Sequence, residues 1–500
     1  MLAPLVIQGG MGVAVSSWRL ARAVSRTGQL GVVSGTALDA VFGRRLQRGD
    51  PAGDRRRALA AFPAPAIAGR VLERYFIPGG KAADVPFRAI PMASFPPKRD
   101  QLELVVTANF VEVWLAKEGH GGAVGVNLLE KVQAPTIPAL HGAMLAGVDV
   151  VLMGAGIPRT IPGILDRLAR GDAAELALDV ADKTPKEEFA LAFDPAEFLE
   201  AQPPTLARPE FLAIVSSATL ASMLLKKSTG RVDGFVIEGP TAGGHNAPPR
   251  GPLQLNARGE PIYGQRDNAD LAAFRALGAP FWLAGSWGTP AGLARALDEG
   301  AAGIQAGTLF AFCRESGLTD ELKRQTIELV RRGAADVVTD PLASPTGFPF
   351  KVLQLEGSLS DAELAAQRRL TCDLGYLRRA YRREDGGVGW RCPAEDVDAF
   401  VRKGGAPGET AGRKCICNAL LANVGLAQLR GDGSAELPLV TCGDGIDAIA
   451  PLIATGDGSY SAEEVVEHLL SDVETVAGRS ASRGARPRSS AESTPLVIAE

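Results

Sequence analysis

Residues 281–310 read FWLAGSWGTPAGLARALDEGAAGIQAGTLF and contain one complete strand–helix–strand unit. The apolar run Phe281–Ala284 is typical of a buried strand. Pro290 begins a helical pattern that ends at Gly300, and a second apolar strand, Gly303–Gln305, follows it. Continuous apolar strands, rather than alternating ones, favour a parallel sheet that helices cover on both faces.

The same strand–helix rhythm extends back to the start of the chain. The other strands expected are Pro4–Gln8, Leu30–Ser34, Gly122–Asn127, Val148–Leu152, Phe211–Val215 and Gly234–Ile237. The other helices expected are Ser16–Thr27, Gln101–Gly119, Ile137–Gly147, Thr160–Arg170, Ala218–Ser228 and Asp270–Leu277. Eight strand–helix units are the number that a (β/α)8 TIM barrel requires, so we expect an α/β fold of that kind.

The barrel is expected to occupy residues 1–335, with two interruptions. Residues 48–120 form an insertion between the second and third strands, and residues 174–209 form a polar excursion with a hairpin. After residue 335 the rhythm stops. Residues 336–475 read as a mainly helical C-terminal extension, and residues 476–500 as a disordered tail rich in Ser, Arg, Ala and Pro.

The bulk composition is that of an ordinary globular protein. The chain has 500 residues, 46% of them hydrophobic and 22% charged, with a net charge of −4. There is no basic excess to indicate nucleic acid, no apolar stretch of about 20 residues to cross a membrane, and no signal peptide at the start. We therefore expect a cytoplasmic protein, either monomeric or homo-oligomeric.

Polar and glycine-rich segments follow several of the strands, at the end of the barrel where active sites lie. Ile7-Gln8-Gly9-Gly10-Met11-Gly12 completes the first strand, and three glycines there let the backbone approach a flat ligand closely. Asn127 ends the third strand, where its amide offers a donor and an acceptor to a ring edge. A tight turn and a capping Asn are the equally weighted structural interpretations.

The loops after the last two strands are candidates for a phosphate site. They read Gly285-Ser286-Trp287-Gly288 and Gln305-Ala306-Gly307-Thr308. Loops at these positions commonly bind phosphate in this fold, because backbone amides and helix N-termini donate to it. Ordinary turn glycines are the alternative.

His245 is the histidine that we expect to be functional. It follows Ala242-Gly243-Gly244 after the sixth strand, and imidazole can take a proton near pH 7 or stabilise an anion. Of the other three histidines, His120 precedes a strand at the opposite end of the barrel, where residues serve stability. His141 lies on an expected helix and His468 near the tail, so both are expected to be structural or solvated.

In order, these motifs resemble the nitronate monooxygenase family (2-nitropropane dioxygenases) and the related FMN-dependent enoyl-ACP reductases. The strings that carry the resemblance are Ile7-Gln8-Gly9-Gly10-Met11-Gly12, Gly125-Val126-Asn127-Leu128, Ala242-Gly243-Gly244-His245 and Gly303-Ile304-Gln305-Ala306-Gly307-Thr308-Leu309-Phe310. They span about residues 1–320. The chain departs from the family at Gly285-Ser286-Trp287, where two glycines and an aliphatic residue are usual.

The resemblance implies an FMN-dependent oxidoreductase and a role for each motif. Met11 and the glycines around it would line the flavin ring, and Asn127 would bond its edge. His245 would be the active-site residue. The implied cofactor-binding residues are Gly9, Gly10, Met11, Gly12, Asn127, Gly243, Gly244, Gly285, Ser286, Gly307 and Thr308. The family's basic residue near the flavin pyrimidine has no candidate in Val215-Ser216-Ser217.

Two reactions fit that resemblance. In the first, FMN accepts electrons from a nitronate or nitroalkane and O2 is the second substrate, yielding a carbonyl compound and a nitrogen oxyanion. In the second, NAD(P)H reduces an enoyl thioester. A third interpretation is a flavin- or metal-binding partner protein whose extension mediates assembly. It stays open because the barrel fold is compatible with many different functions.

Four cysteines of the extension, Cys372, Cys392, Cys415 and Cys417, could form one ligand set. Four thiols that include a Cys-x-Cys could hold zinc or an iron–sulfur cluster. Their spacing is not a standard pair of Cys-x2-Cys knuckles. We therefore expect buried free cysteines and no metal site.

Overall fold

The computed structural model describes residues 3–454 and 458–483, and eight parallel strands form its centre. The strands are β1 (Val6–Gln8), β2 (Gly31–Ser34), β3 (Val124–Leu129), β4 (Val150–Gly154), β8 (Glu210–Val215), β9 (Gly234–Glu238), β10 (Phe281–Ala284) and β11 (Gly303–Ala306). They pair in chain order, β11 pairs with β1, and a parallel bridge between Ile7 and Leu30 joins β1 to β2. The ring is closed, and the expected (β/α)8 barrel is confirmed.

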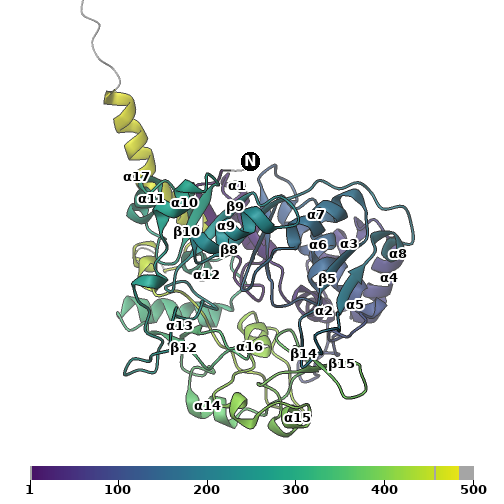
Figure 1. The fold of residues 1–500 in the computed structure, drawn as a ribbon. Coiled ribbons are helices and arrows are strands. Elements are labelled where there is room, and N and C mark those ends of the chain that lie inside the picture. The colour runs from purple at the N-terminus through teal and green to yellow at the C-terminus, as the bar shows by residue number, and fades with distance from the viewer. Residues whose placement is uncertain (1–2, 455–457, 484–500) are drawn as a thin grey trace, which may run out of the picture.

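Helices surround this ring (Figure 1). They are α1 (Trp18–Arg26), α2 (Leu38–Gln47), α5 (Arg99–Lys117), α6 (Thr136–Leu145), α7 (Ile161–Arg170), α9 (Ala218–Lys227), α10 (Leu271–Ala276), α11 (Pro290–Asp298), α12 (Thr308–Ala311) and α13 (Asp320–Arg331). Each helix expected from the sequence is present within a few residues. Thr289 caps α11 by accepting a hydrogen bond from the Gly292 amide, and Pro290 fits the first turn because it needs no amide donor there.

Apolar side chains fill the interior of the barrel. They form one buried cluster of Ile7, Leu30, Val32, Val150, Leu152, Leu212, Val236, Trp282 and Ala284. The indole of Trp282 donates to the Pro4 carbonyl at 2.8 Å, which satisfies its one polar atom. The barrel is thus a packed core, and ligands are confined to its ends.

Further elements lie in the segments 48–120 and 174–209. The insertion holds α3 (Asp54–Ala60) and α4 (Pro65–Tyr75) and leads into α5. The excursion pairs β5 (Ala174–Ala177) with β7 (Ala190–Phe193) as an antiparallel hairpin, and it also contains β6 (Val180–Ala181) and α8 (Pro195–Leu199).

The extension contains helices and two antiparallel strand pairs. Its elements are β12 (Val337–Asp340), β13 (Phe350–Leu353), α14 (Ala362–Gln367), β14 (Arg379–Arg382), β15 (Val388–Arg391), α15 (Val397–Arg402), α16 (Ile416–Asn423) and α17 (Ala462–Arg483). Short 3-10 turns are η1 (Gln265–Asp267) in the barrel and η2 (Pro407–Thr410) and η3 (Ile446–Ile453) in the extension. Helix α17 continues past position 476, where the tail was expected to begin, and residues 484–500 lie outside the described residues.

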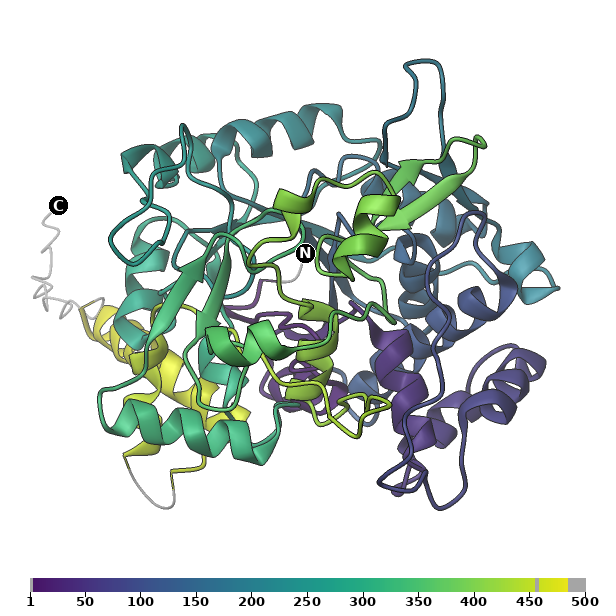
Figure 2. The same cartoon turned by 90° about the horizontal axis from the view of Figure 1, so that it is seen from below.

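The extension is joined to the barrel at several points. Strand β14 pairs in parallel with β6 of the excursion, and α17 packs against α1 and α11. Seen from below, its helices and hairpin lie across the barrel (Figure 2). None of the helices within the described ranges combines the length and apolar composition that a membrane crossing needs.

The buried histidine His141 of α6 makes a stability prediction possible. Its ring lies 5.2 Å from that of Phe193, neither ring nitrogen has a partner, and burial lowers its pKa from 6.5 to about 4. Below pH 6.5 this histidine becomes protonated in the unfolded chain but stays neutral in the folded chain. The free energy of unfolding therefore decreases as the pH falls. Between pH 7 and pH 5, His141 is expected to lower the free energy of unfolding by about 2 kcal/mol.

We expect His141→Leu to remove that part of the pH dependence. Urea unfolding of wild type and variant at pH 7 and pH 5 measures it. The other histidines are common to both proteins, so the difference between their slopes isolates His141. Equal slopes would contradict the assignment.

Candidate active site

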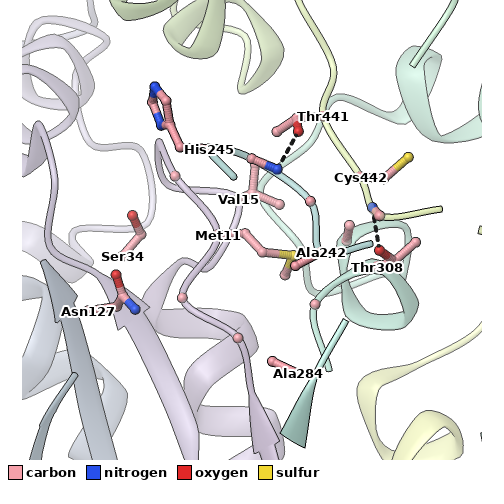
Figure 3. A pocket seen from close by; sticks show the side chains of 18 of the residues that line it. Met11, Val15, Ser34, Asn127, Ala242, His245, Ala284, Thr308, Thr441 and Cys442 are labelled. Atoms are coloured by element: carbon pink, nitrogen blue, oxygen red, sulfur yellow. Dashed lines mark hydrogen bonds between the residues drawn. The ribbon is translucent and has the colours of Figure 1, made fainter. Parts of the chain in front are cut away.

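A cavity of about 450 Å³ lies at the carboxyl ends of the strands, between the barrel and the extension. Every site residue expected from the sequence lines it: Gly9, Gly10, Met11, Gly12, Asn127, Gly243, Gly244, His245, Gly285, Ser286, Gly307 and Thr308. Strand β3 and the loops after β1, β9, β10 and β11 supply them. The closed ring brings these loops to one place although they are far apart in the chain (Figure 3).

One wall of the cavity is backbone where a side chain would not fit. A Cβ added to Gly10 would lie 2.2 Å from the Cβ of Asn127, far inside van der Waals contact. Asn127 and Ser34 lie on the same side of the cavity (Figure 3). Within the described ranges the Asn127 side-chain amide makes no hydrogen bond, so both its donor and its acceptor are available to a ligand.

The loops after β10 and β11 offer polar groups to an anion. Gly285 and Ser286 both have positive φ, +87° and +58°, which turns the chain sharply after the strand. The Ser286 and Trp287 amides donate to no acceptor in the described part of the chain. Thr308 accepts a hydrogen bond from the Gly443 amide at 2.9 Å, and its own hydroxyl hydrogen is left to donate.

A buried polar atom in the lining also lacks a partner. The Oε1 atom of Gln305, at the end of β11, is buried and accepts no hydrogen bond from any described residue. A buried acceptor without a donor is costly, so a bound group with N–H or O–H atoms would fit here. Together with the backbone wall and the amide-bearing loops, this lining fits a flavin mononucleotide.

His245 is held by contacts from the extension. Its Nε2 lies 2.7 Å from the hydroxyl of Ser344, and its ring meets that of Phe350 edge-on at 4.9 Å. Burial, and then the positive charge of Lys131, lower its pKa well below 6.5, so the imidazole is neutral at pH 7. With Nε2 bonded to Ser344, Nδ1 is the ring nitrogen for which no described residue is a partner.

Two charged side chains near His245 were not anticipated from the sequence. Glu238 ends β9 and lines the cavity, and burial raises its carboxyl pKa to about 7. Lys131 lies over the ring of Phe348 at 3.9 Å, and burial lowers its pKa to about 8. Glu238 could have been predicted as a site residue, because a charged residue at the end of an apolar strand is a recognisable sequence signal. No sequence signal points to Lys131, which stands in a loop.

A buried acid and a phenol mark the edge of the cavity. The Tyr376 hydroxyl, from the extension, donates to Asp39 of α2 at 2.5 Å. Burial raises the carboxyl pKa of Asp39 to about 6, and the hydrogen bond from Tyr376 works in the opposite direction. Tyr376 lines both this cavity and a neighbouring one of about 500 Å³.

The extension holds the His245 loop in place. Gly244 donates to the Thr441 hydroxyl at 2.8 Å and accepts from the Lys351 amide at 2.9 Å. A Cβ on Gly243 would lie 2.8 Å from the backbone of Cys442. The sequence did not show that the extension contributes these contacts to the His245 loop.

The other histidines lie away from the cavity. His120 lies at the amino end of β3, where its ring contacts the Ala116 carbonyl and the Gly122 amide. His141 is buried in α6, and His468 lies on α17.

Residues 187–340 match the protein-family model described as Nitronate monooxygenase. The matched segment includes β8 to β11, and with them His245 and both amide-bearing loops. The match confirms the resemblance to nitronate monooxygenases over this segment, which is less than half of the chain, and supports an oxidoreductase. A search of curated proteins finds no relative of the chain.

Several solved structures are similar to the chain at low sequence identity. FabK from Thermotoga maritima is 16% identical, with 96% of each chain covered and a TM-score of 0.48. A nitroalkane oxidase from Streptomyces ansochromogenes is 16% identical, with 96% of this chain and 98% of that chain covered and a TM-score of 0.47. The enoyl reductase domain of MlnA from Bacillus amyloliquefaciens is 12% identical, with 97% of each chain covered and a TM-score of 0.47. At TM-scores below 0.5 these likenesses add nothing to the fold established from the strand pairing.

Proposed function

We propose that the chain is an FMN-dependent enzyme that oxidises nitronates or nitroalkanes with O2. The observation that carries the proposal is the meeting of three features in one cavity. These are the backbone wall at Gly10, the amide-bearing loops after the last two strands, and a neutral His245.

The lining supports FMN as the cofactor. Gly9, Gly10, Met11 and Gly12 would contact the ring, and Asn127 would bond its edge. Gly243 and Gly244 would carry the histidine loop past it. Gly285, Ser286, Gly307 and Thr308 would hold the phosphate, because amides and hydroxyls in tight turns bind phosphate well. FMN, once bound, supplies the redox chemistry, and the protein supplies binding and orientation.

His245 is assigned the proton transfer. Its imidazole is neutral at pH 7, and Nδ1 is free to accept the proton from the carbon next to the nitro group. The hydroxyl of Ser344 holds the ring in one orientation through Nε2. The Lys131 ammonium acts on His245 through its charge, and positive charge near that ring would favour the anionic nitronate.

The discriminating test is anaerobic reduction of the bound flavin. Purified protein is expected to be yellow, to release FMN rather than FAD, and to lose its visible absorbance when mixed with an alkyl nitronate. NADPH should bleach it much more slowly, because the alternative reaction, enoyl-thioester reduction, is the one that needs NAD(P)H.

Rapid bleaching by NADPH, followed by reoxidation with an enoyl thioester, would replace nitronate oxidation by the reductase function. Colourless protein that cannot be reconstituted with FMN would reject both functions.

A further inference from the structure

The Ser344 hydroxyl that holds His245 belongs to a longer row of hydrogen bonds. His245 Nε2 lies 2.7 Å from Ser344 Oγ, and Ser344 Oγ lies 2.8 Å from Thr346 Oγ1. The Lys131 ammonium donates to the same threonine oxygen at 3.4 Å. Three polar side chains therefore extend in one continuous row from the imidazole.

This row connects the imidazole to the second cavity. His245 lines the cavity assigned to FMN, whereas Thr346 and Lys131 line the neighbouring cavity of about 500 Å³ and not the first. Ser344 is fully buried between them and lines neither cavity. The two hydroxyls thus lead from the active site into a separate compartment.

The second cavity reaches the surface of the molecule. Asp179, Arg379 and Glu409 line it and are exposed. During a turnover the first cavity would be occupied by FMN and substrate. A proton that arrives at Thr346 could therefore pass to solvent without crossing the occupied site.

The loop between β12 and β13 holds the two hydroxyls in place. Pro345 separates Ser344 from Thr346, and its ring restricts the backbone between them. Ser344 Oγ also accepts a hydrogen bond from the Thr346 amide at 3.2 Å. The Lys131 ammonium, 3.9 Å from the ring of Phe348, contacts the same loop. The row is therefore fixed by local contacts and does not depend on a bound ligand.

A buried imidazole needs such a path if it is to act as a base. Burial, and then the charge of Lys131, lower the pKa of His245, so an imidazolium is costly at this position. The ring avoids that cation if it releases a proton from Nε2 as it accepts one at Nδ1. Ser344 is the residue to which Nε2 can pass that proton.

We propose that Ser344 and Thr346 relay a proton from His245 to solvent in the second cavity. As Nδ1 takes the substrate's proton, Nε2 gives its proton to Ser344 Oγ, the Ser344 hydroxyl gives its own to Thr346 Oγ1, and the Thr346 hydroxyl gives its own to water. Both hydroxyls are restored and the ring stays neutral.

The remaining proton is released when the site empties. Solvent that enters the first cavity takes the Nδ1 proton, and Nε2 regains one through the same hydroxyls. Each turnover then releases one proton, as charge balance requires when a neutral nitroalkane yields a neutral carbonyl compound and an oxyanion. This role rests on the proposed function. Ser344 and Thr346 act through His245 and are positioning residues.

Thr346→Val tests the relay, because valine has nearly the shape of threonine but no hydroxyl. Lys131 keeps its charge in this variant, and only the path beyond Ser344 is broken. Anaerobic reduction of the bound flavin by a neutral nitroalkane should slow by about tenfold or more, up to the roughly 10²–10⁴-fold expected for loss of the base itself. Reduction by a pre-formed nitronate should not change, because no proton is removed from it. Thr346→Ser replaces the hydroxyl and should recover most of the lost rate.

Matched variants separate the relay from a general effect on the fold. Thr326→Val is the control, because Thr326 is fully buried in α13, donates to the Leu322 carbonyl at 2.8 Å and lines neither cavity. It should react with the nitroalkane as wild type does. Ser344→Ala breaks the row one step earlier and should show a deficit at least as large as that of Thr346→Val. The double variant should lose no more than Ser344→Ala alone, because the two hydroxyls act in series.

A measurement without substrate distinguishes the relay from the proposed function. In protein labelled with ¹⁵N-histidine, NMR follows the exchange of the His245 ring N–H with solvent, and His245→Ala identifies the signal. Exchange should slow in Thr346→Val by about the same factor as the nitroalkane reaction. Slowed exchange in a protein whose wild type reduces its flavin with no nitroalkane would support the relay and reject the proposed function.

Two results would overturn the relay. The first is a Thr346→Val variant with wild-type exchange and a wild-type nitroalkane rate. The second is an equal loss of rate with nitroalkane and nitronate, because it would show that Thr346 serves only the shape of the site.

Discussion

Replacing His245 with alanine is expected to lower turnover of a neutral nitroalkane by roughly 10²–10⁴-fold, the range for loss of a general base. The variant should keep FMN, because the residues proposed to contact the ring and the phosphate lie mainly on other loops of the cavity. Turnover of a pre-formed nitronate should fall less, since no proton has to be removed from it. Steady-state O2 uptake with both forms of one substrate measures the two effects.

The pH profile provides a second readout. Burial and Lys131 depress the His245 pKa, so the neutral base persists below pH 6.5, and activity on a nitroalkane should decline only at lower pH. His468→Ala is the matched control, because that histidine lies on α17, outside the cavity lining. Unchanged kinetics of His245→Ala with both substrate forms would reduce His245 to a structural residue. Equal large losses with both would assign it to anion binding.

Gly10→Ala is expected to weaken FMN binding by about ten- to hundredfold, because overpacking of this kind costs about 1–3 kcal/mol. The added methyl group would lie 2.2 Å from the Cβ of Asn127, so it must displace Asn127 or push the loop into the space for the ring. Fluorescence titration of the apoprotein with FMN measures the affinity.

Gly69→Ala is the control for this experiment. Gly69 lies on α4, outside the cavity lining, and a Cβ there meets nothing within 4 Å. It should bind FMN as wild type does. Thermal unfolding of both variants separates a local change at the cavity from a global loss of stability. Wild-type affinity in Gly10→Ala would mean that the ring does not lie against this loop.

The sequence by itself determined the barrel and the residues at its mouth. Strands such as Phe281–Ala284 are short, apolar and followed by glycine. These features can be recognised in the local sequence, and they are typical of strands in a buried parallel sheet. Closure of eight such strands brings their carboxyl ends together. The barrel fold therefore predicts that the glycine loops at Gly10 and Gly307 lie close together, although they are far apart in the chain.

Only the tertiary structure decided how the extension completes the site. Thr441 and Ser344 contact the His245 loop, although each lies about a hundred residues or more away from it in the sequence. The charge of Lys131, from the loop after β3, also acts on His245. Such pairings depend on how surfaces fit after the chain has folded, and spacing along the chain does not encode them.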